Sequence, residues 1–312
     1  MNPKAAELLR GLNEAGLQGR IVPAYRIIDV GYDILSLKNE GLLDKEFYDM
    51  YMSKYKYGLP DSMPAAKSLI IVAVHTTGII LTFRHKGNEY RCVVPPTYAN
   101  VVDIDKQVKA VLEKALPGSR MVKAIFPFKT LATRTGLAKY GKNNITYTEC
   151  GGSYHRLTAF YTDMDLETDH WQQKEMMAQC VECDLCLRAC PTGAIKKDRF
   201  LLRAHKCLTF HNEMPGDRPF PSTIRMSAHN AIVGCMRCQD ACPMNEVNKG
   251  TVVEGEVYSE EETEYLLKGE FQNEAAEEIM EKLERSGLDL SIFPRNLVVL
   301  IDQAECQKSA KS

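Results

Sequence analysis

The sequence predicts a mixed α/β fold of the α+β kind, followed by a cysteine-rich segment and a short helical C-terminal appendage. Residues 1–165 combine β-branched apolar runs, typical of buried strands, with segments whose apolar residues recur at helical spacing. Eight of the 11 cysteines lie between residues 180 and 242. Residues 251–312 contain two charged helical patterns. These observations divide the chain into three expected parts: 1–166, 167–250 and 251–312.

Local signals place the elements of the first part. Asn2 and Pro3 are typical of a helix start, and Gly16 of the position beyond its end. The turn-like sequence at 85–88 lies between two apolar segments and indicates a hairpin. In chain order we expect a helix from Pro3, a buried strand over 68–74, hairpin strands over 78–84 and 89–94, helices over 104–115 and 128–137, and strands near 145–147 and 153–166.

The C-terminal part has helix signals of its own. Ser259 and Glu262 form the pattern of a capping box, in which each side chain satisfies the other residue's backbone N–H. The helix that they start is expected to end near Gly269, and a second helix is expected over residues 273–285. Together with the apolar run 297–301, these helices predict an acidic appendage that packs against the rest of the chain.

Charge is unevenly distributed along the chain. The formal net charge is −2, yet residues 251–312 hold 15 acidic and 6 basic residues, so the preceding part carries a positive balance. An acidic segment is a poor surface for phosphate, which argues against a nucleic acid partner. The longest apolar stretch, 68–83, is shorter than the ~20 residues that span a bilayer, and no signal peptide or twin-arginine motif is seen. We expect a cytoplasmic protein that does not enter a membrane.

The cysteines carry the clearest chemical signal. Residues 180–191 follow the spacing C-x2-C-x2-C-x3-C-P of bacterial ferredoxins, and residues 235–243 read C-x2-C-x3-C-P after a detached Cys207. In such runs three closely spaced thiolates bind one [4Fe–4S] cluster, and the cysteine before proline binds the other. The pattern therefore assigns Cys180, Cys183, Cys186 and Cys242 to a first cluster, and Cys190, Cys207, Cys235 and Cys238 to a second cluster.

Zinc is the main alternative, since it also favours C-x2-C pairs. Four zinc ligands leave unexplained the third cysteine at x2 spacing, its x3-C-P continuation and the near-repeat downstream. A disulfide framework is disfavoured because nothing in the sequence indicates secretion. The sequence therefore predicts electron transfer through two iron–sulfur clusters.

With these motifs placed, the chain resembles the epoxyqueuosine reductase family, whose members are cobalamin-dependent relatives of the reductive dehalogenases. The resemblance covers about residues 20–250 and rests on Leu59-Pro60, the run 65–72, the loop 135–143, Gly152-Ser153-Tyr154 and the order of the cysteine runs. It implies a nitroreductase-like α/β domain that holds cobalamin, beside a ferredoxin-like domain that feeds electrons to cobalt. No Asp-x-His-x-x-Gly motif occurs, which fits base-off cobalamin without a protein lower ligand and fits equally a protein that has lost the corrin.

Two departures from the family pattern bear on the substrate. The family keeps an acidic general acid shortly before its glycine loop, whereas the equivalent stretch here, 121–129, has no carboxylate. The tRNA-modifying members also extend into helical repeats, and here only the acidic appendage follows the cysteine runs. We therefore expect a small-molecule substrate and do not expect tRNA as a partner.

The resemblance marks a set of residues for the cobalamin site, all in glycine-containing segments. They are Gly136, Gly141, Lys142, Asn143, Gly152 and Ser153. Glycine allows the backbone to approach a planar cofactor closely, although the same spacing is equally common in an ordinary helix cap and turn.

Tyr154 and His155 follow these glycines and are the expected proton donors, because a phenol or an imidazolium can protonate a carbanion-like intermediate. Adjacent residues of a strand point to opposite faces, so only one of the two can reach the cofactor. The alternative is that Tyr154 packs inside a strand and His155 faces solvent.

Three functions remain open from the sequence. The leading one is a cobalamin-dependent iron–sulfur reductase, in which electrons pass through the two clusters to cobalt for reductive cleavage of a small molecule. The second is an epoxyqueuosine reductase acting on tRNA, and the third is a non-catalytic two-cluster electron carrier. Any of them requires a low-potential electron donor such as ferredoxin or flavodoxin.

Overall fold

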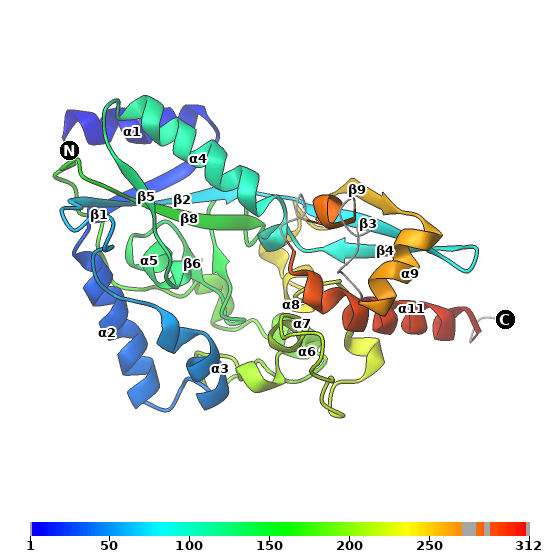
Figure 1. Ribbon diagram of the computed structural model, residues 1–312. Coiled ribbons are helices and arrows are strands. Elements are labelled where there is room, and N and C mark those ends of the chain that lie inside the picture. Colours follow the sequence, from blue (N-terminus) through cyan, green and yellow to red (C-terminus); the bar gives the residue numbers. More distant parts are fainter. Residues whose placement is uncertain (1, 270–278, 284–287, 310–312) are drawn as a thin grey trace. The chain divides into compact units, whose positions relative to one another are not determined.

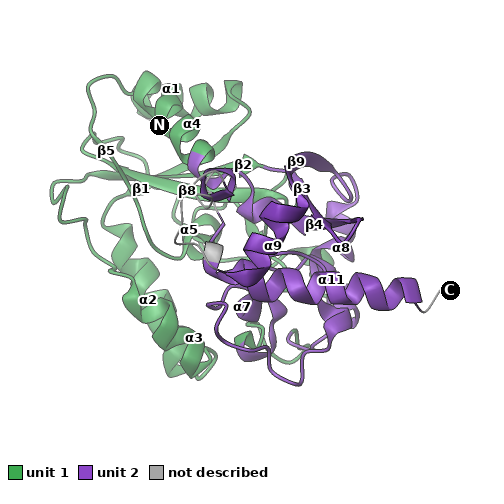
Figure 2. Cartoon of the chain, turned by 45° about the vertical axis from the view of Figure 1, so that its right-hand side comes forward, with its two compact units in different colours: residues 1–75, 103–184, 195–204 green, residues 76–102, 185–194, 205–312 purple. Residues whose placement is uncertain are grey.

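A computed structural model describes residues 2–269, 279–283 and 288–309 of the chain (Figure 1). The chain forms two compact units, each assembled from separated segments (Figure 2). Unit 1 comprises residues 1–75, 103–184 and 195–204, and unit 2 comprises residues 76–102, 185–194 and 205–312. The expected division into three consecutive parts stays a prediction about the order of functional segments, because the compact units interleave along the chain.

Unit 1 is built on a four-stranded antiparallel sheet. Its strands, in spatial order, are β1 (Gln18–Pro23), β2 (Ser68–His75), β8 (His155–Thr162) and β5 (Met121–Lys123). In the middle of the sheet, Ile71 of β2 lies opposite Arg20 of β1 and Ala159 of β8. The central strands β2 and β8 are therefore paired on both edges, which buries their backbone polar groups in ladder hydrogen bonds.

Helices cover both faces of this sheet (Figure 1). On one face α1 (Pro3–Glu14) and α4 (Val101–Ala115) pack against Ile70 and Val72, and on the other α2 (Arg26–Asn39) and α5 (Phe128–Arg134) pack against Leu69 and Ile71. Alternate residues of β2 thus enter two different cores, which explains why its sequence is apolar without interruption.

Unit 2 contains a three-stranded sheet in the order β4 (Asn88–Val94), β3 (Gly78–His85) and β9 (Val252–Tyr258). The pair β3–β4 is antiparallel, whereas β3–β9 is parallel. The core of this unit lies between the sheet and the helices α9 (Glu260–Lys268) and α11 (Phe293–Ser309), with Phe83 stacked on Tyr258 at 4.8 Å between ring centroids. The C-terminal helices are therefore part of the folded unit.

Short elements connect these layers. The helices are α3 (Lys45–Met50), α6 (Leu185–Ala189), α7 (Leu208–Asn212) and α8 (Arg237–Asp240), and the strands are β6 (Lys139–Tyr140) and β7 (Thr146–Tyr147). Single 3-10 turns cover Met52–Lys54, Pro96–Tyr98, Ala178–Cys180, Ala204–Lys206, Met226–Ala228, Pro243–Asn245 and Leu290–Ile292.

Elements with a strong local signal are confirmed. Asn2 caps α1 through a hydrogen bond from Lys4 N–H to its Oδ1 at 2.9 Å, and Ser259 and Glu262 form the expected capping box of α9. The strand over 68–74, the hairpin and the helix over 104–115 are confirmed as well. The helix expected over 128–137 ends at Arg134, and the strand expected over 153–166 covers only β8.

Other elements differ from expectation or were not anticipated. The helix expected over 273–285 lies largely outside the described residues, and the apolar run 297–301 falls inside α11. The strands β1, β5 and β9 and the helix α2 had no counterpart among the expected elements. Within the described part of the chain, no helix combines the length and apolar character needed to cross a membrane.

Candidate metal centre

Unit 2 contains all four cysteines predicted to bind the second cluster. Cys190 follows α6 directly, Cys207 is the N-cap residue of α7, and Cys235 and Cys238 lie at the start of α8. Helices α6 and α8 pack against each other (Figure 1). Each helix is only about one turn long, because the ligand loops around it take the chain out of helical geometry. One compact unit therefore supplies every thiol of this site.

The thiols of the second site lie close enough to affect one another. Desolvation, together with the nearby Cys235, raises the pKa of Cys207 to about 11. Desolvation likewise raises the pKa of Cys235, with a contribution from Cys190. A metal that binds here must displace the thiol protons, so binding is coupled to proton release and strengthens as the pH rises.

Hydrogen-bond donors are directed at these sulfurs. The backbone N–H of Ala194 donates to Cys190 Sγ at 3.3 Å, and the side-chain amide of Asn230 donates to Cys235 Sγ at 3.2 Å. Backbone N–H groups of Thr209 and Phe210 donate to Cys207. Such donors stabilise the negative charge of ligating thiolates and adjust the potential of an iron–sulfur cluster. The residues present therefore fit a [4Fe–4S] cluster.

No three His, Cys, Asp or Glu side chains in the described ranges converge as they would around one metal ion. A cubane takes one thiolate on each iron, so its ligands stand farther apart than the four ligands of a single zinc ion.

Two predicted ligands of the first cluster, Cys180 and Cys183, lie in unit 1, while Cys186 and Cys242 belong to unit 2. In unit 1 the loop that carries Cys180 and Cys183 is held by Lys142. The Lys142 ammonium donates to the carbonyl oxygens of Val181 and Cys183, at 3.3 and 2.8 Å, and its backbone N–H donates to Cys180 Sγ at 3.5 Å. Lys142 is thus a partner of the first-cluster loop.

The glycine loop predicted for cobalamin includes the turn between β6 and β7, and Gly136 precedes β6. Gly136 has φ +66°, and a Cβ there would lie 2.6 Å from Gln172 Nε2. A Cβ on Gly141 would lie 2.5 Å from the ring of Tyr147. Asn143 is also engaged within the loop, since its Nδ2 donates to the Tyr147 hydroxyl at 2.9 Å and its Oδ1 accepts the N–H of Ile145. These contacts all lie within unit 1, and the roles of Gly136, Gly141 and Asn143 at cobalamin stay predictions.

The segment 152–155 is buried. Gly152 has φ +55°, and Ser153 and Tyr154 are 1 and 2% exposed. His155 begins β8, with Nδ1 3.1 Å from the carbonyl oxygen of Gly152 and Nε2 3.0 Å from Thr146 Oγ1. A carbonyl can only accept, so Nδ1 carries the proton and Nε2 accepts from the threonine hydroxyl. Burial lowers the pKa of His155 to about 4, which leaves the ring neutral at pH 7.

A carboxylate that the sequence did not single out lies beside the stretch 121–129. Asp105 of α4 accepts a hydrogen bond from Thr158 Oγ1 at 2.7 Å and forms an ion pair with Lys123 of β5. Burial and the nearby Arg156 lower the pKa of Lys123. In the sequence Asp105 is one of several charged residues on the polar side of an amphipathic helix. No sequence signal near it indicates contact with residues 121–129.

Comparisons with known proteins agree with this geometry. Residues 179–245 match the 4Fe-4S double cluster binding domain family. The epoxyqueuosine reductase of Prochlorococcus marinus is 32% identical over 145 residues, which are 45% of this chain and 45% of the relative. The epoxyqueuosine reductase of Synechocystis is 32% identical over 118 residues, 38% of this chain and 39% of the relative. The chain therefore matches less than half of the length of these curated relatives.

Solved structures share the fold. The epoxyqueuosine reductase of Bacillus subtilis, solved with its catalytic aspartate loop swung out of the active site, has a TM-score of 0.67 at 21% identity, covering 95% of this chain and 80% of that one. A second epoxyqueuosine reductase, solved with an epoxyqueuosine-modified tRNA stem loop, has a TM-score of 0.56 at 21% identity, covering 79% of this chain and 66% of that one.

Over part of its length this chain is similar to epoxyqueuosine reductases. Its mixed α/β class, its double 4Fe-4S segment and its helical C-terminal part are confirmed. The expectation of a small-molecule substrate, and with it the exclusion of tRNA, is wrong, because the relatives are epoxyqueuosine reductases and one structural neighbour was solved with a tRNA stem loop.

The expectation failed because it counted the acidic residues of 251–312 without regard to their partners, and several of them form ion pairs or hydrogen bonds in the folded protein. In unit 2 Glu254 pairs with Arg91, and Glu262 pairs with Lys282 and closes the capping box of α9. Glu305 accepts a hydrogen bond from Tyr90. Acidic groups engaged inside their own unit do not define a repulsive surface.

Proposed function

We propose that this protein reduces epoxyqueuosine in tRNA, with electrons that pass through two [4Fe–4S] clusters. One observation carries the proposal: unit 2 holds all four predicted ligands of the second cluster with N–H donors at their sulfurs, in a chain whose relatives are epoxyqueuosine reductases. The third possibility, a non-catalytic electron carrier, shares the clusters but does not account for the relatives' activity.

The reaction sets clear requirements. Removing an epoxide oxygen so that a carbon–carbon double bond remains takes two electrons and two protons, and the oxygen leaves as water. A [4Fe–4S] cluster passes electrons singly, so two clusters in series can deliver the pair from a low-potential donor such as ferredoxin or flavodoxin. The chain must therefore bind both clusters, hold the modified nucleotide and supply protons near it.

Cobalamin belongs to the proposal through the family relationship, which supports it as a further cofactor. The side-chain contacts of the predicted loop residues do not, since Asn143 bonds to Tyr147 and Lys142 bonds to the loop of Cys183. We assign no step to these residues through cobalamin. The cobalt content of the anaerobically reconstituted protein tests whether the corrinoid binds at all.

Of the two expected proton donors, we favour Tyr154 over His155. Both ring nitrogens of His155 have hydrogen-bond partners, and a pKa of about 4 leaves almost no imidazolium at neutral pH. Tyr154 directly precedes His155, the first residue of β8. Unit 1 also contains the ion pair of Asp105 with Lys123, which is a second candidate source of the proton. A tRNA substrate also makes a cytoplasmic location part of this proposal.

The test uses the full chain, reconstituted anaerobically with iron, sulfide and cobalamin. Transfer RNA that contains epoxyqueuosine is incubated with the protein and a low-potential reductant, and nucleosides are quantified by mass spectrometry. We expect queuosine to appear, and to be absent with tRNA that lacks the modification. Loaded protein that binds both clusters and cobalamin but forms no queuosine would overturn the proposal. Two clusters without bound corrinoid or turnover would favour the electron carrier.

A further inference from the structure

Asn230 occupies a defined position between the 3-10 turn Met226–Ala228 and α8. Its Nδ2 donates to the carbonyl oxygen of Ala228 at 2.9 Å and to Cys235 Sγ at 3.2 Å, and its Oδ1 accepts the backbone N–H of Met236 at 2.8 Å. The amide orientation follows from these partners: rotating it by 180° would place its oxygen against the Ala228 carbonyl and its NH₂ group against an N–H. One N–H is therefore directed at the sulfur.

Other donors at the second cluster come from the backbone and from threonine hydroxyl groups. Ala194 donates its N–H to Cys190, the Thr192 hydroxyl lies 3.6 Å from Cys190 Sγ, and Thr209 and Phe210 act on Cys207. The backbone N–H groups stay in place whatever the side chains are. The Asn230 bond depends on a side chain, so a single substitution can remove it while the backbone donors remain.

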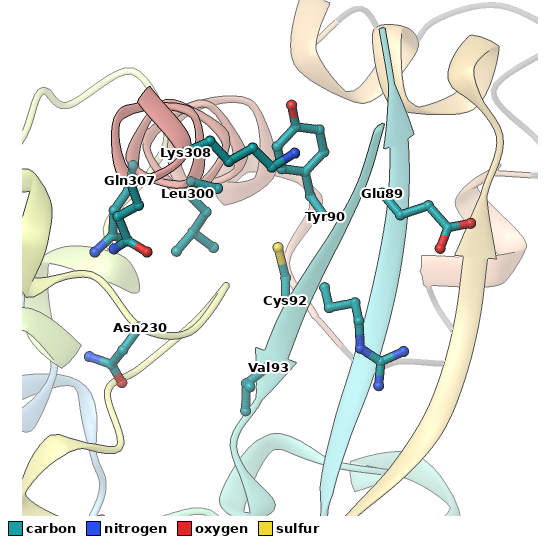
Figure 3. Close-up of a pocket in the computed structure, with 11 residues that line it drawn as sticks. Glu89, Tyr90, Cys92, Val93, Asn230, Leu300, Gln307 and Lys308 are labelled. Carbon is teal, nitrogen blue, oxygen red and sulfur yellow. The ribbon is translucent and has the colours of Figure 1, made fainter. Parts of the chain in front are cut away.

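Asn230 also borders a cavity of about 260 Å³ between β4 and α11. Figure 3 shows Asn230 on one side of this cavity, with Cys92 and Val93 of β4 and Leu300 and Gln307 of α11 around it. Asn230 thus lines the cavity and also contacts a cysteine of the second cluster, whose sulfur accepts a hydrogen bond from its amide.

We propose that Asn230 is a positioning residue that raises the reduction potential of the second cluster through its N–H···S bond to Cys235. A donor at a ligating sulfur stabilises the reduced, more negatively charged cluster more than the oxidised one, and so favours electron uptake. This inference rests on the cluster assignment within the proposed function, and it does not depend on the substrate.

The experiment measures the midpoint potential of each cluster in Asn230→Asp by redox titration with dithionite, followed by electron paramagnetic resonance. Aspartate has nearly the same shape and keeps the acceptor for Met236, but it removes the donor at Cys235. We expect the equilibrium for one-electron reduction of the second cluster to fall at least tenfold, the size expected for one hydrogen bond to a charged acceptor, which corresponds to ~59 mV for a one-electron couple. The first cluster should keep its potential.

Gln303→Glu is the matched control. Gln303 lines the same cavity, so this variant introduces the same charge change and leaves the Asn230 hydrogen bond to Cys235 in place. A shift of equal size in both variants would mean that the charge acts through space, and would overturn the assignment of the hydrogen bond. Unchanged potentials in Asn230→Asp with both clusters retained would overturn it as well.

If Asn230→Asp fails to retain the second cluster, a measurement on the wild-type protein tests the hydrogen bond between Asn230 and Cys235. Chains grown with ¹⁵N-labelled asparagine should show nitrogen coupling to the reduced second cluster in pulsed electron paramagnetic resonance. Absence of that coupling would refute the bond. Iron content and potentials are measured without tRNA, so failure of this inference and failure of the reductase activity are distinguishable.

Discussion

The ammonium group of Lys142 lies 2.9 Å from the carboxylate of Asp184, in the same unit as Cys180 and Cys183. The Lys142 side chain is only 11% exposed, and two backbone carbonyls of the cysteine loop share its protons. A residue expected to lie against a corrin is therefore a cross-link between the glycine hairpin and the loop of the first cluster.

Replacing Lys142 with methionine should weaken that loop. The carbonyls of Val181 and Cys183 lose their donor, which costs about 1–3 kcal/mol of unfolding free energy, and the first cluster loses a nearby positive charge. We expect a lower urea midpoint and a lower potential for the first cluster. Lys139→Met is the control, because Lys139 pairs with Glu175 at the surface. Equal behaviour of the two variants would contradict this role of Lys142.

Serine in place of Cys238 should remove the second cluster alone. Wild-type protein is expected to hold about eight iron atoms per chain and the variant about four, because Cys238 is one of the four thiolates assigned to the second cluster. Iron and sulfide are quantified after anaerobic reconstitution, with Cys306→Ser as the control outside the cysteine runs. Loss of all iron would show that the two sites do not load independently.

The buried imidazole of His155 predicts a specific acid sensitivity. Its pKa of about 4 in the folded protein is below the ordinary value of 6.5, so the unfolded chain binds the proton more readily. The stability that neutral His155 contributes is complete above about pH 6.5 and is lost as the pH falls toward 4, at up to about 1.4 kcal/mol per pH unit. In total this is about 3 kcal/mol for a shift of about 2.5 units.

Thermal unfolding of wild type and His155→Gln at pH 7 and pH 5 measures this contribution. Glutamine can keep one donor and one acceptor for Gly152 and Thr146, but it does not titrate. The variant should lose less stability between the two pH values than wild type, whereas the exposed control His205→Gln should match wild type. Parallel curves for wild type and His155→Gln would disprove the assignment.

Tyr154→Phe tests the proton donor. We expect turnover of epoxyqueuosine to fall roughly 10²–10⁴-fold with cluster content unchanged, as for loss of a general acid. Asp105→Asn is the companion variant, because the ion pair of Asp105 with Lys123 is the alternative proton donor. Full turnover in Tyr154→Phe together with loss in Asp105→Asn would transfer the role to that pair.

Asn296 of α11 should prove essential for unit 2. Its Nδ2 donates to the carbonyl oxygens of Asn212 and Ile232, at 2.9 and 2.8 Å, and the residue is 1% exposed. Asn296→Ala leaves both buried carbonyls without this donor, so the unfolding free energy should drop by about 2–5 kcal/mol. Gln303→Ala, on the same helix, is the control, and denaturant unfolding is the measurement. A drop of the same size in both variants would indicate a general effect on α11.

The sequence predicted best what depends on neighbours along the chain. Asn2, the Ser259–Glu262 pair and the turn before Asn88 act within a few residues, and all three structures formed as expected. The pairing of β9 with β3 joins segments about 170 residues apart, and no local pattern specifies such a partner. On α2, Ile28 and Leu35 are exposed although apolar, which masks the amphipathic pattern of that helix.

The candidate site divides in the same way. Cysteine spacing groups the ligands of the second cluster because the loop itself must wrap a cubane. The partners of Lys142 and the ion pair of Asp105 with Lys123 arise from tertiary packing between separate elements. The residue types in the sequence do not show that the glycine hairpin contacts the cysteine loop.

The interleaved composition of unit 2 has a consequence for the order in which a newly made chain can acquire its clusters. The eight cysteines of the two runs are synthesised before β9 and α11, and until those segments exist β3 lacks its parallel neighbour and the carbonyl oxygen of Asn212 lacks the Asn296 donor. Domains assemble as units once their last segment is available. Loading of the second cluster should therefore follow synthesis of α11, and the thiols need protection from oxygen throughout that interval.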